Sequence, residues 1–212
     1  MTVLTPGIIA AIENQGRCIL GLSGGSTPRP VYEALGQEKG IDWTKLWIFL
    51  VDDRYVPADN PNSNQFLLYS SLLKYAPVPQ SHLIVPDTTL PIDACVDLYA
   101  RHLDDLLKKG PPDIVTLGMG DDGHIASLFP PLTDAAFGPA LAINTQTDAF
   151  SVKQRISVTF PVLDQAKQSF FFLKGAEKKK VWEKMLASDE GERRWPAKRV
   201  MERTPVTIIM SP

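Results

Sequence analysis

Short apolar runs alternate with amphipathic segments along most of the chain, and this alternation is the main structural signal in the sequence. The runs are rich in β-branched and aromatic residues and have the length of buried strands. We predict strands at 17–22, 46–51, 82–85, 113–117, 155–160, 169–173 and 206–210. Their continuous apolar character is typical of strands that are covered on both faces, as in a parallel sheet.

Helical periodicity separates these strands. In the clearest case, 91–109, apolar residues recur at intervals of three and four, as on the inner face of a helix. Shorter patterns predict helices at 6–14, from 28 onward, and at 65–73, 161–166 and 176–187. Strands that alternate with helices predict an α/β fold with a layered, mainly parallel twisted sheet flanked by helices, in a Rossmann-like arrangement.

The size and charge of the chain narrow the function classes. Its 212 residues, with 44% hydrophobic and 22% charged content, predict one domain that covers 1–212. A net charge of -2 and a pI near 5.9 provide no global basic field for nucleic acid or an anionic membrane, and a small anionic ligand stays open. We expect a monomer or a small homo-oligomer.

The amino terminus and the cysteines predict a reduced, cytoplasmic protein. The first basic residue is Arg17, so the start of the chain lacks the charge of a signal peptide, and no apolar run has the length to span a bilayer. Cys18 and Cys95 lie in separate apolar segments, which favours buried thiols over a disulfide. The histidines show no metal-binding spacing, so we expect no metal site.

A turn rich in glycine and hydroxyl residues follows the first predicted strand. It consists of Ser23, Gly24, Gly25, Ser26 and Thr27, of which the last is the expected N-cap of the next helix. Backbone N–H groups and the positive helix end would then point at one spot, which suits a phosphate. An ordinary helix cap explains the same residues equally well, and the turn matches no nucleotide-binding motif.

Charged residues also follow the second predicted strand, where Asp52, Asp53 and Arg54 precede a long polar segment. Most charge triplets of this kind are solvated loops. In a parallel sheet, however, this strand end shares an edge with the preceding glycine-rich turn, and ligands bind at that edge. The shared edge favours a functional role.

The segment 113–130, DIVTLGMGDDGHIASLFP, carries the strongest chemical signal. Gly118, Gly120 and Gly123 satisfy G-x-G-x-x-G after a strand, but the proline pair at 130–131 stops any helix after barely two turns. The acidic residue expected about 20 positions later in a dinucleotide site is also missing. We therefore expect the glycines to expose side chains at the strand end.

His124 is the best candidate for a general base, with Asp122 two residues before it. Imidazole has an ordinary pKa near 6.5, so it can be neutral at cell pH and accept a proton from water. A plain loop histidine is the alternative. His82 lacks a neighbouring acid or glycine turn and is expected to be structural, and His102 is expected at the surface of helix 91–109.

Two further basic residues stand at element starts. Arg155 begins a predicted strand, and Lys178 lies in the first turn of helix 176–187. A positive charge there opposes the helix dipole unless an anion sits nearby. From local sequence alone, the adjoining Lys179 and Lys180 make a solvated basic face the simpler interpretation.

Four motifs in order resemble the 6-phosphogluconolactonase family. They are SGGSTP at 23–28, DDRYVP at 52–57, GMGDDGHIASLFP at 118–130 and RISVTF at 155–160. The resemblance covers 8–200, and the pattern GMG-x-DGH-x-ASLFP is specific to that family within a wider fold shared with glucosamine-6-phosphate deaminase. One departure is that Val152, Lys153 and Gln154 precede Arg155, where the family usually has proline before the arginine.

The resemblance implies hydrolysis of 6-phospho-D-glucono-1,5-lactone to 6-phosphogluconate in the pentose phosphate pathway, without a metal or organic cofactor. It implies that the partner is this sugar phosphate lactone. It also implies His124 as the catalytic histidine, with Asp122 as its neighbour in the motif, and a strand-end acid and arginine at Asp52 and Arg54. The phosphate contacts are implied to be the 23–27 turn, Arg155 and Lys178.

The chemistry of such a substrate agrees with this assignment, because a dianionic phosphate at one end and an ester carbonyl at the other need an anion cradle and a distant base. We hypothesise that neutral His124 deprotonates water for attack on C1 and later returns the proton to the leaving ring oxygen. Arg54 or N–H groups of the glycine loop would stabilise the oxyanion. Asp52 or Asp122 would orient these groups.

Two other functions are considered. In a sugar-phosphate isomerase or deaminase of the same fold, the strand-end acid would move a proton at C2. Such deaminases place tyrosine where this chain has Arg54, and a glutamate in the segment after DGH, where this chain reads IASLFP. A non-catalytic sugar-phosphate-binding regulator would carry a DNA-binding or partner-binding extension, for which we expect no room before Ile8.

Overall fold

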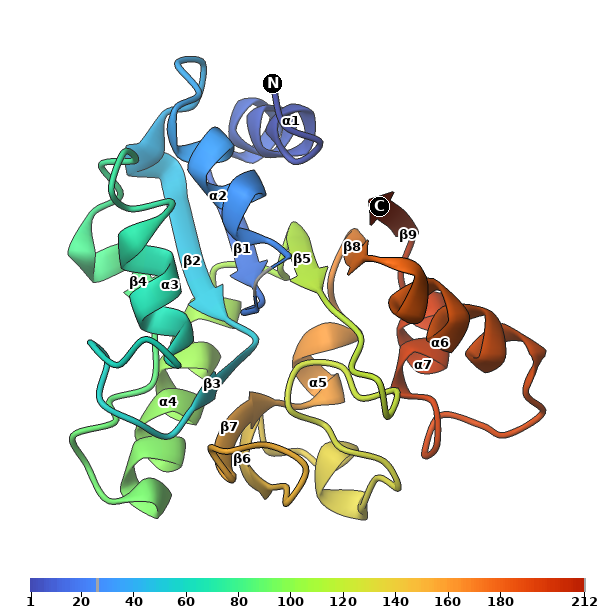
Figure 1. Ribbon diagram of the computed structural model, residues 1–212. Helices are drawn as coiled ribbons and strands as arrows, with labels where there is room; N and C mark the ends of the chain where they lie inside the picture. Colours follow the sequence, from blue (N-terminus) through green and yellow to red (C-terminus); the bar gives the residue numbers. More distant parts are fainter. Residues whose placement is uncertain (26, 212) are drawn as a thin grey trace.

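The computed structural model describes residues 1–25 and 27–211 (Figure 1). Within these residues the main sheet has six strands in the order β4-β2-β1-β5-β8-β9, and every neighbouring pair is parallel. The strands are β1 (Cys18–Leu22), β2 (Leu46–Leu50), β4 (Leu83–Ile84), β5 (Ile114–Leu117), β8 (Ser169–Lys174) and β9 (Val206–Ser211). The predicted α/β fold with a mainly parallel sheet is confirmed.

Helices cover both faces of this sheet. They are α1 (Thr5–Gln15), α2 (Arg29–Gly36), α3 (Asn64–Ser70), α4 (Ile92–Leu107), α5 (Phe160–Leu163), α6 (Ala176–Ala187) and α7 (Pro196–Arg203). Because side chains alternate along a strand, Leu20 and Leu22 pack with α1, α2 and α3, whereas Ile19 belongs to the core that includes α4, α6 and α7. Helix α7 was not predicted, because its apolar positions are few.

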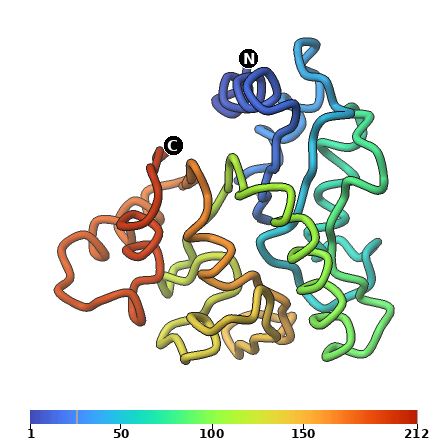
Figure 2. Tube along the Cα trace, turned by 180° about the vertical axis from the view of Figure 1, so that it is seen from behind, coloured from blue at the N-terminus to red at the C-terminus, as the bar shows by residue number. Residues whose placement is uncertain are grey.

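A second sheet of three antiparallel strands lies below the carboxyl ends of β1, β2 and β5 (Figures 1 and 2). Its order is β3 (Asp52–Arg54), β7 (Gln154–Val158) and β6 (Ala142–Gln146). The sequence pattern did not separate β7 from the strands of the parallel sheet, and it predicted neither β3 nor β6. The sequence pattern missed these features of β3, β6 and β7 because contacts between residues far apart in the sequence determine which strands pair.

Val51 is the residue at which the chain passes from one sheet to the other. Its N–H donates to the carbonyl of Leu22 in β1, and its own carbonyl accepts from the N–H of Val158 in β7, both at 2.9 Å. The side chain of Val51 is fully buried. The next residues therefore emerge directly at the carboxyl edge of the parallel sheet, where ligands bind in open α/β folds.

The start of α2 differs from the prediction. Helix α2 begins at Arg29 with Pro28 as its N-cap, so the expected N-cap role of Thr27 is wrong. With Thr27 as N-cap, the third helical position would be Pro30, which has no N–H to donate, and the cap would lose one of its usual partners. Ser26, the other hydroxyl residue of this turn, lies outside the described residues.

The predictions for the two cysteines and for His82 and His102 are confirmed. Cys18 and Cys95 are free and buried. His82 stacks on Trp47 with ring centroids 3.8 Å apart, as expected for a structural residue, and His102 is exposed. Among the described helices, none is long and apolar enough to cross a membrane.

Asp53 is fully buried and anchors the polar segment that follows β3. Its Oδ1 accepts hydrogen bonds from the N–H groups of Arg54 and Asn64, at 2.7 and 2.6 Å. Its Oδ2 accepts from the hydroxyl of Ser63 and from the N–H and side-chain amide of Gln65. Burial raises the pKa of Asp53 to about 6, against the lowering effect of these hydrogen bonds. Asp53 therefore ties β3 to the start of α3.

We predict that Asp53→Asn destabilises the protein by about 2–4 kcal/mol at pH 8, where the wild-type carboxylate is ionised. Both oxygens of Asp53 face donors, so an amide NH₂ in either place would put donor against donor. Urea unfolding measures the change. Asp59→Asn, at an exposed position of the same segment, is the control and should differ from wild type by less than about 0.5 kcal/mol. Equal stability of the two variants would contradict the anchoring role.

Candidate active site

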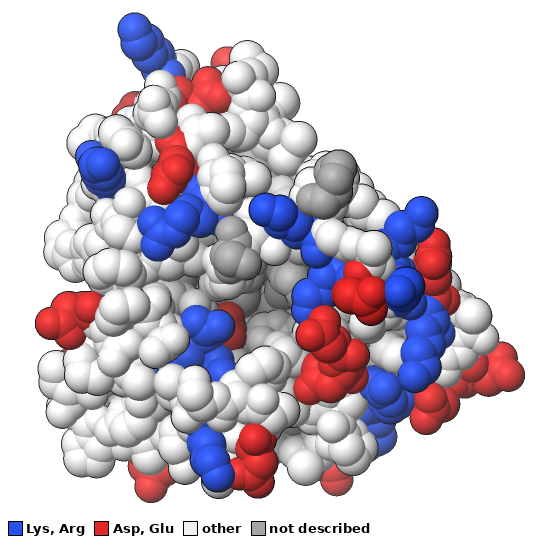
Figure 3. Space-filling view, in the orientation of Figure 1, with Lys and Arg blue, Asp and Glu red and all other residues white. Residues whose placement is uncertain are grey.

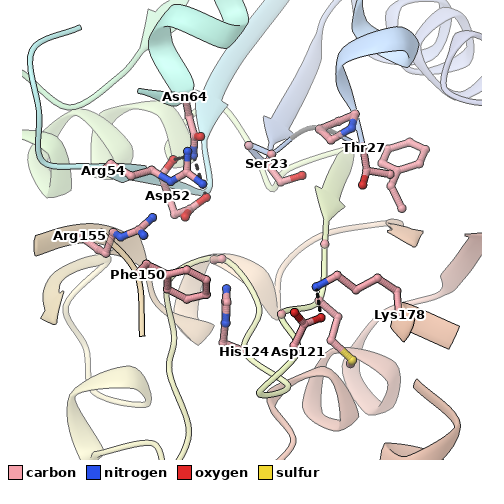
Figure 4. Close-up of a pocket in the computed structure, with 18 residues that line it drawn as sticks. Ser23, Thr27, Asp52, Arg54, Asn64, Asp121, His124, Phe150, Arg155 and Lys178 are labelled. Carbon is pink, nitrogen blue, oxygen red and sulfur yellow. Dashed lines mark hydrogen bonds and ion pairs between the residues drawn. The ribbon is translucent and has the colours of Figure 1, made fainter. Parts of the chain in front are cut away.

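A cavity of about 390 Å³ opens at the carboxyl edge of the parallel sheet. On this face of the molecule, basic side chains flank a central hollow (Figure 3). The cavity collects predicted site residues from five separate segments of the chain (Figure 4). These are Ser23, Gly24, Gly25, Thr27, Asp52, Arg54, His124, Arg155 and Lys178.

The turn after β1 is held from behind by a buried hydroxyl network. The N–H of Ser23 donates to Thr116 Oγ1 at 3.0 Å, and the hydroxyl of Tyr32 donates to the carbonyl of Ser23 at 2.8 Å. Burial raises the pKa of Tyr32 to about 12, so its hydroxyl stays protonated. The N–H of Ser23 is bonded within the protein, while Ser23 itself lines the cavity.

Asn64 connects the glycine-rich turn to Asp52. Its amide donates to the carbonyl and to Oδ1 of Asp52, at 2.8 and 3.1 Å. Gly24 packs against the same side chain so closely that a Cβ at this position would lie 1.8 Å from Asn64 Oδ1. The other carboxylate oxygen of Asp52 accepts from Ser127 Oγ at 2.6 Å. Two residues that the sequence did not single out, Asn64 and Ser127, therefore fix the carboxylate of Asp52.

Arg54 and Arg155 face each other across the antiparallel pair of β3 and β7. Like charges directly opposite on neighbouring strands repel. Each guanidinium is anchored on a backbone carbonyl: Arg54 donates to Asn62 at 2.7 Å, and Arg155 donates to Val152 at 3.0 Å. Burial and the charge of Arg54 lower the pKa of Arg155, and Asp52 partly offsets them. This wall of the pocket suits an anion.

The position of Arg155 also resolves the departure from the family pattern. The residues before it form a hairpin between β6 and β7, and the carbonyl of Val152 in this hairpin accepts the Nε–H of Arg155. The aromatic ring of Phe150, from the same hairpin, lies 5.5 Å from the guanidinium carbon. The side chain therefore reaches the pocket without a preceding proline.

His124 forms a pair with Asp122. Its Nδ1 lies 2.5 Å from Asp122 Oδ1, and its backbone N–H donates to the same oxygen at 3.1 Å. Burial acts to raise the pKa of Asp122, but the hydrogen bonds from His124 outweigh it and hold this pKa below the ordinary value. Because an ionised carboxylate only accepts hydrogen bonds, Nδ1 carries a proton in the neutral ring and Nε2 remains an acceptor.

The ring of His124 points into the pocket beside Phe150 (Figure 4), and it also contacts the ring of Phe129. Its centroid lies 4.7 Å from that of Phe129 and 5.6 Å from that of Phe150, and its side chain is 17% exposed. Asp122 stands behind the imidazole, outside the cavity lining. The sequence had left open whether Asp52 or Asp122 orients the histidine, and the contact belongs to Asp122.

The glycine loop around this pair is closed by its own backbone. The N–H of Gly120 donates to the carbonyl of His124 at 2.8 Å, and the N–H of Gly123 donates to the carbonyl of Gly120 at 3.0 Å. Arg194 supports the loop from outside through a 2.8 Å hydrogen bond to the carbonyl of Asp122. No helix follows this loop before Thr133 in the described chain, which agrees with the sequence argument against a dinucleotide site.

Lys178, at the start of α6, reaches the rim of the same cavity. Its ammonium lies 2.8 Å from Asp121 Oδ1, and the sequence had not singled out this acid. Among residues 1–25 and 27–211, no three His, Cys, Asp or Glu side chains are grouped so that they could hold a metal ion. The side chains that line the cavity include an imidazole, three cations, carboxylates, hydroxyls and an amide.

We predict that Gly120→Ala displaces the histidine pair, because a Cβ at this position would lie 2.1 Å from His124 Nδ1 and 2.6 Å from Asp122 Oδ1. The nitrogen shifts of the imidazole, recorded by NMR at pH 8.5, should show the Nδ1–H tautomer in the wild type and lose it in the variant. Gly118→Ala is the matched control, since its Cβ meets nothing within 4 Å. An unchanged tautomer in Gly120→Ala would contradict the geometry.

Comparisons with known proteins agree with the resemblance found in the sequence. Residues 3–209 match the profile of the family described as glucosamine-6-phosphate isomerases/6-phosphogluconolactonase. A protein of Dictyostelium discoideum named "Probable 6-phosphogluconolactonase" is 40% identical over 198 residues, which are 92% of this chain and 84% of the relative. A 6-phosphogluconolactonase of a Nostoc species is 34% identical over 196 residues, which are 89% of this chain and 79% of the relative.

The fold also matches solved structures. The crystal structure of a 6-phosphogluconolactonase from Thermotoga maritima superposes with a TM-score of 0.86 at 27% sequence identity, over 98% of this chain and 92% of the other. The profile match includes every segment that lines the cavity and reaches into the last strand, β9. The chain therefore belongs to the glucosamine-6-phosphate isomerase/6-phosphogluconolactonase family.

Proposed function

We propose that this protein is a 6-phosphogluconolactonase, which hydrolyses 6-phospho-D-glucono-1,5-lactone to 6-phosphogluconate in the pentose phosphate pathway. The observation that carries the proposal is one pocket that brings His124, bonded from behind to Asp122, together with the facing arginines Arg54 and Arg155. The relatives described above are named for the same activity. Residues 1–212 act in this proposal as one domain, because the segments that line the single cavity run from Ser23 to Lys178.

We assign the phosphate end of the substrate to the cations Arg155 and Lys178 of the pocket. Arg155 offers a planar fork of donors, and Lys178 adds a point charge from the opposite rim. The hydroxyls of the turn after β1, including Ser23 and Thr27, complete the cradle in this proposal. Burial and the charge of Arg54 lower the pKa of Arg155, and this supports the assignment because an anion beside Arg155 would stabilise its charge.

The lactone carbonyl is assigned to His124. The imidazole Nε2 takes a proton from water as the water oxygen attacks C1, and the ionised carboxylate of Asp122 stabilises the imidazolium that results. When the bond from C1 to the ring oxygen breaks, the imidazolium gives this proton to the leaving oxygen. The products are the C1 carboxylic acid, which ionises, and the C5 hydroxyl. No metal or organic cofactor takes part in this scheme.

Arg54 is the proposed stabiliser of the oxyanion. The two candidates from the sequence were Arg54 and N–H groups of the glycine loop, but the N–H groups of Gly120 and Gly123 are bonded within the loop. Arg54 lines the cavity and keeps donors beyond the one that bonds Asn62. Asp52 then holds a negative charge beside the arginines, which limits their mutual repulsion.

A deaminase or isomerase reaction at C2 is not favoured. The sequence separates this chain from such enzymes at Arg54 and in the IASLFP segment, and both Arg54 and Ala126 of that segment line the cavity. The differences therefore lie where the substrate would bind. The two relatives reported above carry the name of the lactonase.

We predict that His124→Ala lowers kcat for lactone hydrolysis about 10²–10⁴-fold, the usual contribution of a general base. The assay follows lactone disappearance above its spontaneous hydrolysis. His102→Ala is the control, because this histidine is exposed on α4 and should leave kcat unchanged. A His124→Ala enzyme as fast as wild type would refute the mechanism.

We predict that Arg155→Ala raises KM for the lactone about 10–10²-fold through the loss of charge-assisted hydrogen bonds to phosphate. Lys178→Arg, which keeps the charge, should raise KM less. Lys153→Ala is the matched control on the same hairpin, since its ammonium is exposed and paired with Asp148. Steady-state kinetics measures all three, and an unchanged KM for Arg155→Ala would remove this residue from the cradle.

A further inference from the structure

Lys178 and Asp121 form an ion pair across the rim of the pocket. The ammonium of Lys178 lies 2.8 Å from Asp121 Oδ1, and both side chains line the cavity (Figure 4). Asp121 comes from the glycine loop after β5, whereas Lys178 comes from the first turn of α6. The pair therefore joins two segments that are far apart in the sequence at the entrance to the site.

The partner of Lys178 sets it apart from its neighbours. Lys179 pairs with Glu183 and Lys180 pairs with Glu177, so both of these lysines form ion pairs within α6 itself. A lysine in the first turn of a helix opposes the dipole and calls for an anion nearby. In this structure the anion at Lys178 is the carboxylate of Asp121, which lies 82% exposed while the lysine side chain is 30% exposed.

The other acids at the site are held differently. Asp122 is bonded to the imidazole of His124, and Asp52 is held by the neutral donors of Asn64 and Ser127. The carboxylate of Asp121 is the one among these three that is paired with a cation of the proposed phosphate cradle. It stands where a phosphate oxygen would bind Lys178.

We propose that Asp121 is a specificity-determining residue that competes with phosphate for Lys178 and thereby weakens the binding of phosphorylated ligands. This inference rests on the proposed function, in which Lys178 belongs to the phosphate cradle. A solvent-exposed ion pair contributes little to stability, so a dianion can displace the carboxylate at small cost. The displaced carboxylate still repels the phosphate that replaced it.

The competition has a consequence for the product. Hydrolysis turns an uncharged ester into a carboxylate, so 6-phosphogluconate carries one more negative charge than the lactone. The phosphate is the same in both ligands, so a carboxylate that returns to Lys178 when phosphate leaves favours release of the product and weakens binding of the lactone alike. Asp121 therefore favours product release at the expense of tight binding of the phosphorylated substrate.

The test is the affinity of Asp121→Asn for inorganic phosphate and for 6-phosphogluconate, measured by calorimetry and as competitive inhibition at pH 8 and low salt. Asparagine keeps the shape of the side chain and removes its charge. We expect about three- to tenfold tighter binding of both anions, with a smaller gain in 0.5 M NaCl because salt screens exposed charges. Unchanged affinity at low salt would overturn the proposal.

Glu177→Gln is the matched control. It removes the same unit charge one residue away from Lys178, from an exposed ion pair with Lys180 that lies outside the cavity lining. Phosphate affinity should stay within twofold of wild type. A gain equal to that of Asp121→Asn would reduce the effect to net charge and overturn the proposal.

A double-mutant cycle with Lys178→Met separates competition from plain repulsion. If Asp121 acts by occupying Lys178, the gain from Asp121→Asn should shrink at least threefold in the Lys178→Met background. A gain of undiminished size would show that the acid repels the ligand without competing for the lysine, and this would overturn the proposal. Lactone turnover by the wild type tests the proposed function separately, because phosphate binding is measured without the reaction.

Discussion

The double hydrogen bonding of Val51 is the constraint on which the site depends. The N–H of this residue bonds to the parallel sheet and its carbonyl to the antiparallel one, so the chain changes sheets within a single residue. The change delivers Asp52 to the carboxyl edge of the parallel strands and sets Arg54 opposite Arg155. A chain that continued in the parallel sheet would place these side chains on its two covered faces instead.

The protein holds charged side chains of the pocket in an electrostatically unfavourable arrangement. Two arginines face each other on neighbouring strands, and burial lowers the pKa of one of them. Fixed carbonyls, the carboxylate of Asp52 and the buried anchor Asp53 keep this arrangement in place. Such an arrangement fits a functional site, because side chains with perturbed pKa values are typical of such sites.

The side chains of the site differ in how firmly they are held. Asp52 accepts a short hydrogen bond from Ser127, and the imidazole of His124 shares one with Asp122. Such fixed positions suit a reaction at one carbonyl group. Lys178 is instead held by an exposed acid on another segment. In the proposed function, the part of the pocket around His124 is thus pre-organised, whereas Lys178 would exchange Asp121 for phosphate.

The sequence by itself determined the parallel α/β core, the buried cysteines and the family, because apolar periodicity and contiguous motifs such as the one around His124 are local properties. Most predicted site residues line one cavity. Only the tertiary structure decided that 154–158 pairs with 52–54, that Asn64 and Ser127 hold Asp52, and that Asp121 reaches Lys178. These contacts join segments far apart in the chain, and a one-dimensional pattern carries no record of which ends meet. The start of α2 shows the same limit, because Pro30 removes an N–H that the side chain of Thr27 would need as an N-cap.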